Sequence, residues 1–420
     1  MIKRIKKILK SDYSLSVISK VVIAVVGIFS SAFSTRYLGV MYKGDYGYVT
    51  HIASIIVLVL NLGIYQSYSI NYKKYGREII GKYVNICFLQ FAVLFAVMIL
   101  LMVTIRNPLF CMIVLLVPFN ILRLQYGNIV LIENIRLSLW MNVFNSIASA
   151  LAYLCLYLWA EPGIIYVVGV TVIVDLITVT IFSIKLGIVP KIWKVDYPFL
   201  GSILKFGFIP MISSVLITIN YSIDIIFLKK IGLPQELSYY TLAASIVNYV
   251  WLLPDAFKSV LFSRSAKKFD KESIEFSSQV SSAFIILCLL GFAVIGEWLL
   301  NVFYGAEFRN SYGVTLILIT GAFSMSLYKL LGVVLVSQGK RMVHFISLTI
   351  SAIVNVILNA LLIPHMGMYG AGIASVCSYT ICGTILLVYF CKLYSMKAHC
   401  LLFLTKENVR KVFSPFKHSQ

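Results

Sequence analysis

Charged residues are scarce in this chain of 420 residues. Asp, Glu, Lys and Arg together make up only 12% of it, whereas 60% of the residues are hydrophobic and the mean hydropathy is +0.92. A soluble chain of this length needs a polar exterior, so the composition excludes an ordinary soluble globular protein. We therefore expect lipid to be the main solvent of this chain.

The apolar stretches lack the alternation of polar and apolar residues that is typical of membrane barrel strands. They are continuous runs of about 20 residues, the length that an α-helix needs to cross a bilayer. A helix also satisfies its backbone hydrogen bonds internally, as the bilayer core requires. The sequence predicts an all-α polytopic membrane protein with about 12 transmembrane helices, near residues 14–38, 46–71, 83–105, 109–132, 138–160, 163–186, 201–228, 237–262, 277–299, 311–337, 342–363 and 369–392.

Enzyme signatures are also missing from the sequence. It contains no HExxH, GxxxxGK[ST] or GxSxG motif and no Cys/His cluster, and its five histidines are dispersed. The eight cysteines form no CxxC pair and lie mostly in apolar runs, where free Cys acts as a small apolar side chain. These absences predict a transporter and not an enzyme, with no metal site and no cofactor.

Acidic residues are few, 16 against 36 Lys and Arg, which gives a net charge of +20. The basic residues lie between the apolar runs and not on one basic face, so we expect no nucleic-acid partner. With the N-terminus in the cytoplasm, 26 Lys and Arg fall on the cytoplasmic side and 6 on the other. This positive-inside bias predicts that both termini are cytoplasmic.

A duplication is suggested by two equivalent spans. The stretch from Tyr48 to Ile56 in the second span matches Tyr239 to Val247 in the eighth at five of nine positions. We therefore expect a six-helix bundle at 1–186, a cytoplasmic linker at 187–200, a second six-helix bundle at 201–392 and a basic cytoplasmic tail at 393–420.

Cations inside the expected spans are candidates for substrate binding, because each costs about 2.5–3.5 kcal/mol at a helix centre unless it faces a wet or paired site. Arg123 shares a helix face with Asn120, Lys329 lies in the tenth span and Lys20 in the first. Such cations suit a diphosphate, which Arg binds through two hydrogen bonds and Lys as a point charge. The alternatives are an ion pair with a buried acid and, for the two lysines, snorkelling towards the cytoplasm.

Two acids are expected inside spans, Asp175 in the sixth and Asp224 in the seventh. A carboxylate held away from water can couple transport to protons or sodium ions, so both are candidate ion-coupling residues. The alternative is that they neutralise the cations of the cavity. Asp224 has a further alternative, because it could anchor a helix end beside Lys229 and Lys230.

Four motifs near span ends point to a family. They read R-Y-L-G-x-x-x-x-G-x-Y at 36–46, F-Y-G-x-E-F at 303–308, Q-G-K-R at 338–341 and N-x-x-x-N-x-x-x-x-P-x-x-G-x-x-G-A at 355–371. Together they resemble the polysaccharide-transporter branch of the multidrug/oligosaccharidyl-lipid/polysaccharide exporter superfamily, specifically O-antigen flippases of the Wzx type. Asp224 also falls where relatives commonly carry an acid. The chain departs at Val40 and Met41, where relatives often have Pro and Glu, so this loop is expected to differ in shape.

The resemblance implies two six-helix bundles around a central lumen that work by alternating access. It implies a substrate that is an undecaprenyl-diphosphate-linked oligosaccharide, an O-antigen or capsule precursor, moved across a bacterial cytoplasmic (inner) membrane. The expected partners are this lipid-linked oligosaccharide and the lipid bilayer. A polysaccharide polymerase and a chain-length regulator are further candidates.

Two other functions compete with this interpretation. One is another exporter of the same fold, such as a multidrug antiporter or a peptidoglycan-precursor flippase. The other is a membrane enzyme of the same pathway, such as a saccharide polymerase. Such an enzyme would be expected to carry a large outer loop or an acidic catalytic motif, and the sequence has neither.

Overall fold

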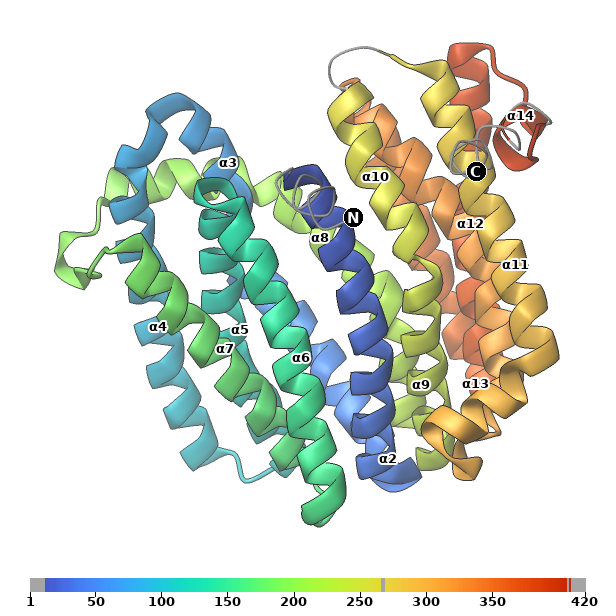
Figure 1. The fold of residues 1–420 in the computed structure, drawn as a ribbon, viewed down its shortest axis with the longest axis horizontal. Coiled ribbons are helices and arrows are strands. Elements are labelled where there is room, and N and C mark those ends of the chain that lie inside the picture. The colour runs from blue at the N-terminus through green and yellow to red at the C-terminus, as the bar shows by residue number, and fades with distance from the viewer. Residues whose placement is uncertain (1–11, 266–268, 406–407, 409–420) are drawn as a thin grey trace, which may run out of the picture. The chain divides into compact units, whose positions relative to one another are not determined.

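The computed structural model describes residues 12–265, 269–405 and 408, and all regular structure within these residues is helical. This confirms the all-α prediction (Figure 1). The α-helices are α2 (Asp12–Leu60), α3 (Ile64–Tyr75), α4 (Ile79–Thr104), α5 (Pro108–Glu133), α6 (Ile135–Trp159), α7 (Ile164–Leu186), α8 (Tyr197–Ile231), α9 (Pro234–Val250), α10 (Leu252–Ser265), α11 (Lys271–Tyr304), α12 (Ser311–Ser337), α13 (Arg341–Tyr394) and α14 (His399–Leu402).

The chain folds as two compact units that divide inside α8, between Thr218 and Ile219. The first unit, which we call unit 1, contains α2 to α7 and the start of α8. The second, unit 2, contains the rest of α8 and all later helices. The expected linker at 187–200 precedes this division, and its role as a domain boundary stays a prediction.

Two helices are long enough to cross a bilayer twice, and each bends at a glycine. Gly39 in α2 has φ 59° and Gly367 in α13 has φ 54°, a left-handed conformation that side chains with a Cβ rarely adopt. Helix α2 has 49 residues and α13 has 54, whereas about 20 suffice for one crossing. These breaks separate the expected spans one and two, and eleven and twelve.

The expected spans two and eight are each interrupted, which the sequence analysis did not foresee. In the second span the helix stops at Leu60, and Leu62 and Gly63 take positive φ before α3 begins. In the eighth span α9 ends at Val250 and α10 starts at Leu252. Pro254 therefore lies in the first turn of α10, where a proline is tolerated, and does not kink a continuous helix. The repeat suggested by the sequence stays a prediction.

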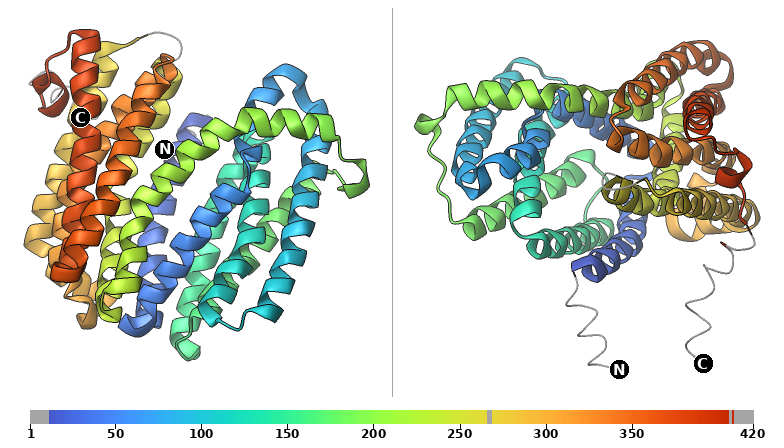
Figure 2. Two further views of the ribbon diagram at one scale, coloured as in Figure 1. Left: turned by 180° about the vertical axis from the view of Figure 1, so that it is seen from behind. Right: turned by 90° about the horizontal axis from the view of Figure 1, so that it is seen from above.

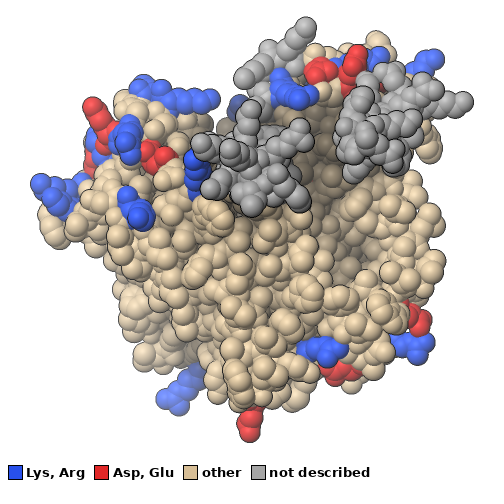
Figure 3. Space-filling view, in the orientation of Figure 1, with Lys and Arg blue, Asp and Glu red and all other residues tan. Residues whose placement is uncertain are grey.

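Nine stretches of the described residues are long and apolar enough to span a membrane. Two of them contain the glycine bends above, and α9 with α10 adds a shorter crossing, so about twelve crossings fit the fold. Large apolar side chains also point outward from these helices, for example Val294 at 84% and Leu151 at 58% exposed. In Figure 3 the charged side chains of the visible face gather towards the two ends of the helices, and an uncharged band lies between them. The chain is a multi-pass membrane protein.

Tyrosines fill the core of unit 1. Tyr68 and Tyr83 pack edge to face with ring centroids 4.9 Å apart, and Tyr126 lies in the same fully buried cluster. The hydroxyl of Tyr83 contacts the hydroxyl of Ser67 at 2.8 Å and accepts a hydrogen bond from the Asn71 amide at 3.0 Å. These hydrogen bonds allow the Tyr83 ring to be buried with its hydroxyl paired.

The first part of α8 lies across the other helices of unit 1 (Figure 2). It touches them most closely where Gly207 meets Gly63, the glycine at the break between α2 and α3. A Cβ added to Gly207 would lie 2.2 Å from the carbonyl oxygen of Gly63, so the two backbones are in direct contact. Only glycine fits at this crossing.

The segment that leads into α8 is fixed to α4. Lys82 pairs with Asp196 at 2.8 Å, and the side chain of Asn85 accepts a hydrogen bond of 2.7 Å from the Lys191 backbone N–H. The hydrogen bond from Lys82, with a second one from the Phe199 backbone N–H, lowers the pKa of Asp196 from its ordinary value. Asp196 also caps the start of α8, as a carboxylate at a helix N-terminus can.

Unit 2 is built around α12. This helix packs against α9, α10, α11 and α13, and 67% of its most apolar stretch is buried, the highest share among the candidate spans of the described chain. Small residues let neighbours approach closely, since a Cβ on Gly383 of α13 would lie 2.3 Å from the carbonyl oxygen of Ser324.

The α8 crossing gives a first prediction. Gly207→Ala should destabilise the protein by at least about 1–3 kcal/mol, because the new methyl group overlaps the Gly63 backbone. We expect a lower melting temperature of the purified protein and a lower inserted abundance. Gly201→Ala is the matched control on the same helix, because open space surrounds its Cβ position. Equal melting temperatures for the two variants would contradict the contact.

Candidate functional site

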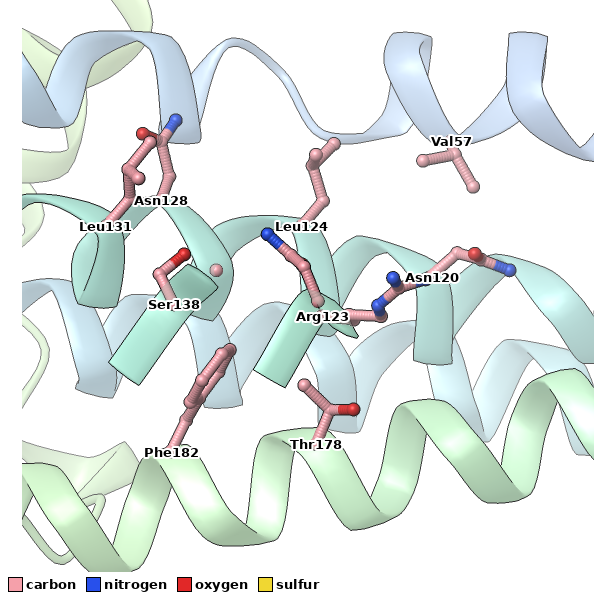
Figure 4. A pocket seen from close by; sticks show the side chains of 11 residues that line it. Val57, Asn120, Arg123, Leu124, Asn128, Leu131, Ser138, Thr178 and Phe182 are labelled. Carbon is pink, nitrogen blue, oxygen red and sulfur yellow. The ribbon is translucent and has the colours of Figure 1, made fainter. Parts of the chain in front are cut away.

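A polar cavity of about 470 Å³ lies among the helices of unit 1. Its lining comes from α2, α5, α6 and α7 (Figure 4) and consists of Val57, Asn120, Arg123, Leu124, Gly127, Asn128, Leu131, Ser138, Asn142, Thr178 and Phe182. The volume falls within the range of about 300–1,000 Å³ that is usual for small-molecule sites. Asn120 and Arg123, which the sequence predicts to share a face, both line it.

The guanidinium of Arg123 is paired. Its Nη1 lies 3.0 Å from Oδ1 of Asp175 on α7, and the Asp175 side chain is only 1% exposed while that of Arg123 is 38% exposed. Asp175 accepts no hydrogen bond of good geometry from the described residues, so Arg123 is what balances its charge there. The ion pair foreseen as an alternative for Arg123 is therefore present. Its other N–H groups remain available to the cavity.

Amide and hydroxyl groups supply the rest of the polar lining. The Asn120 amide donates to the Leu116 carbonyl at 2.9 Å, and the Asn128 amide donates to the Tyr65 carbonyl at 3.0 Å. Asn142 is exposed, and no hydrogen bond joins it to the described residues. Sequence reasoning missed the α6 residues. The signal was present, because Ser138, Asn142 and Asn145 recur at spacings of four and three on one helix face.

The second polar site is a carboxylate inside unit 2. Asp224 on α8 is 1% exposed and accepts hydrogen bonds from Tyr240 of α9 at 2.5 Å and from Ser375 of α13 at 2.5 Å. The Asn359 amide donates a third bond at 2.9 Å. Hydroxyl and amide donors, and no cation among the described residues of unit 2, surround this acid. These donors can stabilise the charged carboxylate, and the same carboxylate can bind a proton or a cation.

A ladder of amides continues from this carboxylate. The Asn359 amide also contacts Oδ1 of Asn355 at 2.8 Å, and the Asn355 amide donates to Oδ1 of Asn220 at 3.0 Å. Asn220 then donates to the Ser351 hydroxyl at 3.2 Å. Asn355 and Asn359 belong to the motif that carried the family resemblance, and the structure shows that their four-residue spacing serves this network. One alternative for Asp224 was an anchor of a helix end beside Lys229 and Lys230. The structure instead holds its carboxylate through Tyr240, Ser375 and Asn359.

Lys329 does not pair with Asp175 or Asp224. Its Nζ lies 3.0 Å from Oδ2 of Asp255 on α10 and 4.2 Å from the ring centre of Trp251, and its side chain is only 10% exposed. Asp255 is the acid that sequence reasoning missed, although it stands directly after Pro254 inside an expected span. A buried lysine next to a carboxylate and an aromatic face is a stabilised pair.

Lys20, the fourth predicted substrate-binding residue, is exposed on α2 and does not line the cavity. A metal centre of three or more His, Cys, Asp or Glu side chains does not occur within residues 12–265 and 269–405. The structure thus brings Asn120, Arg123 and Asp175 together. It places Asp224 in a separate network and leaves Lys20 and Lys329 outside both.

The chain shares its fold with solved structures of membrane transporters. The chain is similar to the lipid II flippase MurJ in an inward closed conformation, with a TM-score of 0.77 and 15% identity over 97% of this chain and 93% of that one. The chain is also similar to an inward-facing multidrug resistance MATE transporter, with a TM-score of 0.65 and 12% identity over 89% of this chain and 94% of that one. For a mutant of the Vibrio cholerae MATE transporter VcmN the TM-score is 0.61 and the identity 13%, over 94% of this chain and 99% of that one. No protein-family profile and no curated protein matches the sequence.

The Arg123–Asp175 pair yields a second prediction. Arg123→Ala leaves Asp175 buried without a cation, which costs about 3–5 kcal/mol, so the inserted abundance should fall. Adding Asp175→Asn removes the unpaired charge and should restore abundance. Quantitative immunoblots of membrane fractions measure both. If the double variant is as scarce as Arg123→Ala, charge balance is not what the pair provides.

Proposed function

We propose that this protein is a flippase that moves undecaprenyl-diphosphate-linked oligosaccharide repeat units, precursors of O-antigen or capsule, from the cytoplasmic to the outer leaflet by alternating access. The fold supports it, because 97% of the chain aligns with a lipid II flippase. The motifs at 36–46, 303–308 and 355–371 support the polysaccharide branch.

The observation that carries this proposal is a polar cavity between membrane-spanning helices. A saccharide diphosphate cannot cross hydrocarbon alone, because its polar groups would lose their hydrogen bonds to water. The cavity around Asn120 and Arg123 offers hydrogen-bonding groups at membrane depth, while the polyprenyl tail can stay in lipid. We assign Asn120 and Arg123 to the substrate site. Roles of Lys20 and Lys329 towards the diphosphate stay predictions.

Ion coupling is assigned to the buried acids. Asp224 is the stronger candidate, because oxygen-bearing and amide side chains surround it and no cation of unit 2 neutralises it among the described residues. Asp175 already has Arg123 as its cation, so a coupling role there requires that the pair opens. The proton and the sodium ion are both compatible with these ligands.

Orientation and partners follow from the same proposal. The charge bias of the sequence supports an orientation with both termini on the cytoplasmic side of the bacterial inner membrane. A polysaccharide polymerase and a chain-length regulator would act on the flipped product and are its expected functional neighbours.

A peptidoglycan-precursor flippase is the second candidate, and the TM-score of 0.77 to the lipid II flippase favours it. Depletion of the protein separates the two. Cells should lyse if the peptidoglycan precursor is the substrate, whereas a surface-polysaccharide flippase should be dispensable for growth. A multidrug antiporter would instead change drug susceptibility and leave surface polysaccharide intact.

The third prediction concerns gene deletion. Deletion should abolish the long surface polysaccharide and cause its lipid-linked repeat unit to accumulate on the cytoplasmic leaflet, because nothing carries it across. Gel analysis of surface polysaccharide and extraction of lipid-linked saccharides measure the two effects. Single repeat units that still reach the surface would indicate a polymerase defect and refute the flippase.

The fourth prediction concerns Asp224. Asp224→Asn keeps the shape of the side chain and removes its charge, so the protein should insert while transport falls at least about tenfold and no longer responds to ionophores that collapse proton or sodium gradients. Asp196→Asn, an acid-to-amide change outside the spans, is the control. Unchanged ionophore sensitivity in Asp224→Asn would remove this residue from coupling.

A further inference from the structure

The net charge of the unit 1 cavity is close to zero. Among the described residues that line it, Arg123 is the one charged side chain, and Asp175 lies 3.0 Å behind its guanidinium. An ion pair presents a dipole to the cavity and not a free positive charge. The arginine therefore donates hydrogen bonds into the cavity without offering a full compensating charge.

A diphosphate would be poorly held by such a lining. Groups that carry two or more negative charges bind where Arg or Lys side chains are free to pair with them, since burying an unpaired charge is expensive. No second Lys or Arg lines the described wall of this cavity. The lysine that sequence analysis expected to help, Lys329, is already paired with Asp255 in unit 2.

The lining suits a group rich in hydroxyls. Asn120 and Asn128 each use the amide NH₂ on a backbone carbonyl, which leaves their Oδ1 atoms as acceptors. Asn142 has its amide free of partners in the described chain, and it can both donate and accept. Ser138 adds a hydroxyl. Donors and acceptors thus alternate around the space, as sugar hydroxyls require, because each one donates once and accepts twice.

We infer that this cavity binds the saccharide part of the substrate, through Asn120, Asn128, Asn142 and Arg123, and that it does not hold the diphosphate. This inference rests on the proposed flippase function and specifies which chemical group the unit 1 site recognises. It predicts specificity for uncharged, hydroxyl-rich sugars at this position.

Charge substitutions at Asn142 test the inference, because this exposed side chain tolerates change. With a saccharide in the cavity, Asn142→Asp loses the donor but keeps the acceptor and should lower transport less than Asn142→Lys, which loses the acceptor and should lower transport on the order of tenfold. With a diphosphate in the cavity the order reverses, because the carboxylate repels it and the ammonium attracts it. Transport per inserted molecule is measured in the deletion strain carrying each variant.

Direct binding gives an independent readout. Purified full-length protein in nanodiscs is titrated with two probes, undecaprenyl diphosphate and the free oligosaccharide released by mild acid from the accumulated precursor. We expect Asn142→Lys to weaken binding of the oligosaccharide and Asn142→Asp to change the affinity for undecaprenyl diphosphate by less than about twofold, because the diphosphate lies elsewhere. Loss of undecaprenyl diphosphate binding in Asn142→Asp would overturn the inference, and so would wild-type behaviour of both variants or no oligosaccharide binding to the wild type.

Asn310→Asp and Asn310→Lys serve as matched controls. Asn310 is exposed at the start of α12, and its side chain makes no capping hydrogen bond. Neither change should alter binding of either probe. A failure of the proposed function looks different from a failure of this inference, because in that case the deletion strain would keep its surface polysaccharide and no variant could be scored for transport.

Discussion

The rest of this structure depends on one constraint, that a charge buried among membrane helices must be balanced inside the protein. The buried acids Asp175 and Asp224 and the buried cation Lys329 meet it in different ways. Asp175 lies beside Arg123, and Asp255 lies beside Lys329. Asp224 has no such cation in unit 2 among the described residues and is held by hydroxyl and amide donors. The two ion pairs are complete without a ligand, whereas the third carboxylate still has a charge that a proton or metal cation can neutralise. This difference makes Asp224 the stronger of the two residues proposed for ion coupling.

The same constraint separates the two polar sites by chemistry. In unit 1 the neutralised arginine leaves a cavity lined by amides, two hydroxyls and one guanidinium edge together with apolar side chains. In unit 2 the network is tightly closed, with Asn220, Asn355 and Asn359 fully buried. An open, weakly charged cavity suits a bulky polar group that must enter and leave. A closed carboxylate site suits a small ion.

Much of the fold was predictable because lipid demands long apolar runs and leaves composition little freedom. The helical class, about twelve crossings and the burial of Asp175 and Asp224 followed from the sequence. The helix interruptions at Leu62 and Trp251 could not be predicted in this way. Both residues are apolar, and hydropathy carries no information about backbone angles. The sequence also does not show which acid pairs with which cation. An ion pair of Arg123 with Asp175 or Asp224 was the alternative to diphosphate binding, and only the packing of α5 against α7 decides between the two acids. Asp255 was missed as the partner of Lys329 for the same reason, because a single sequence cannot show which helix faces Lys329.

Helix α8 is the covalent element that serves both units. Its first part contacts the break between α2 and α3 through Gly207, and its last part carries Asp224. Pro210 lies between them and removes one backbone hydrogen bond, so the helix can bend there. A proton or cation bound to Asp224, as proposed, would change the hydrogen bonds that hold the last part of α8, while the Gly63–Gly207 contact holds the first part against the break between α2 and α3. A helix anchored by backbone contact at one end and by a titratable network at the other is a physical route by which an ion site can bias a substrate site. The flexible point of that route is Pro210.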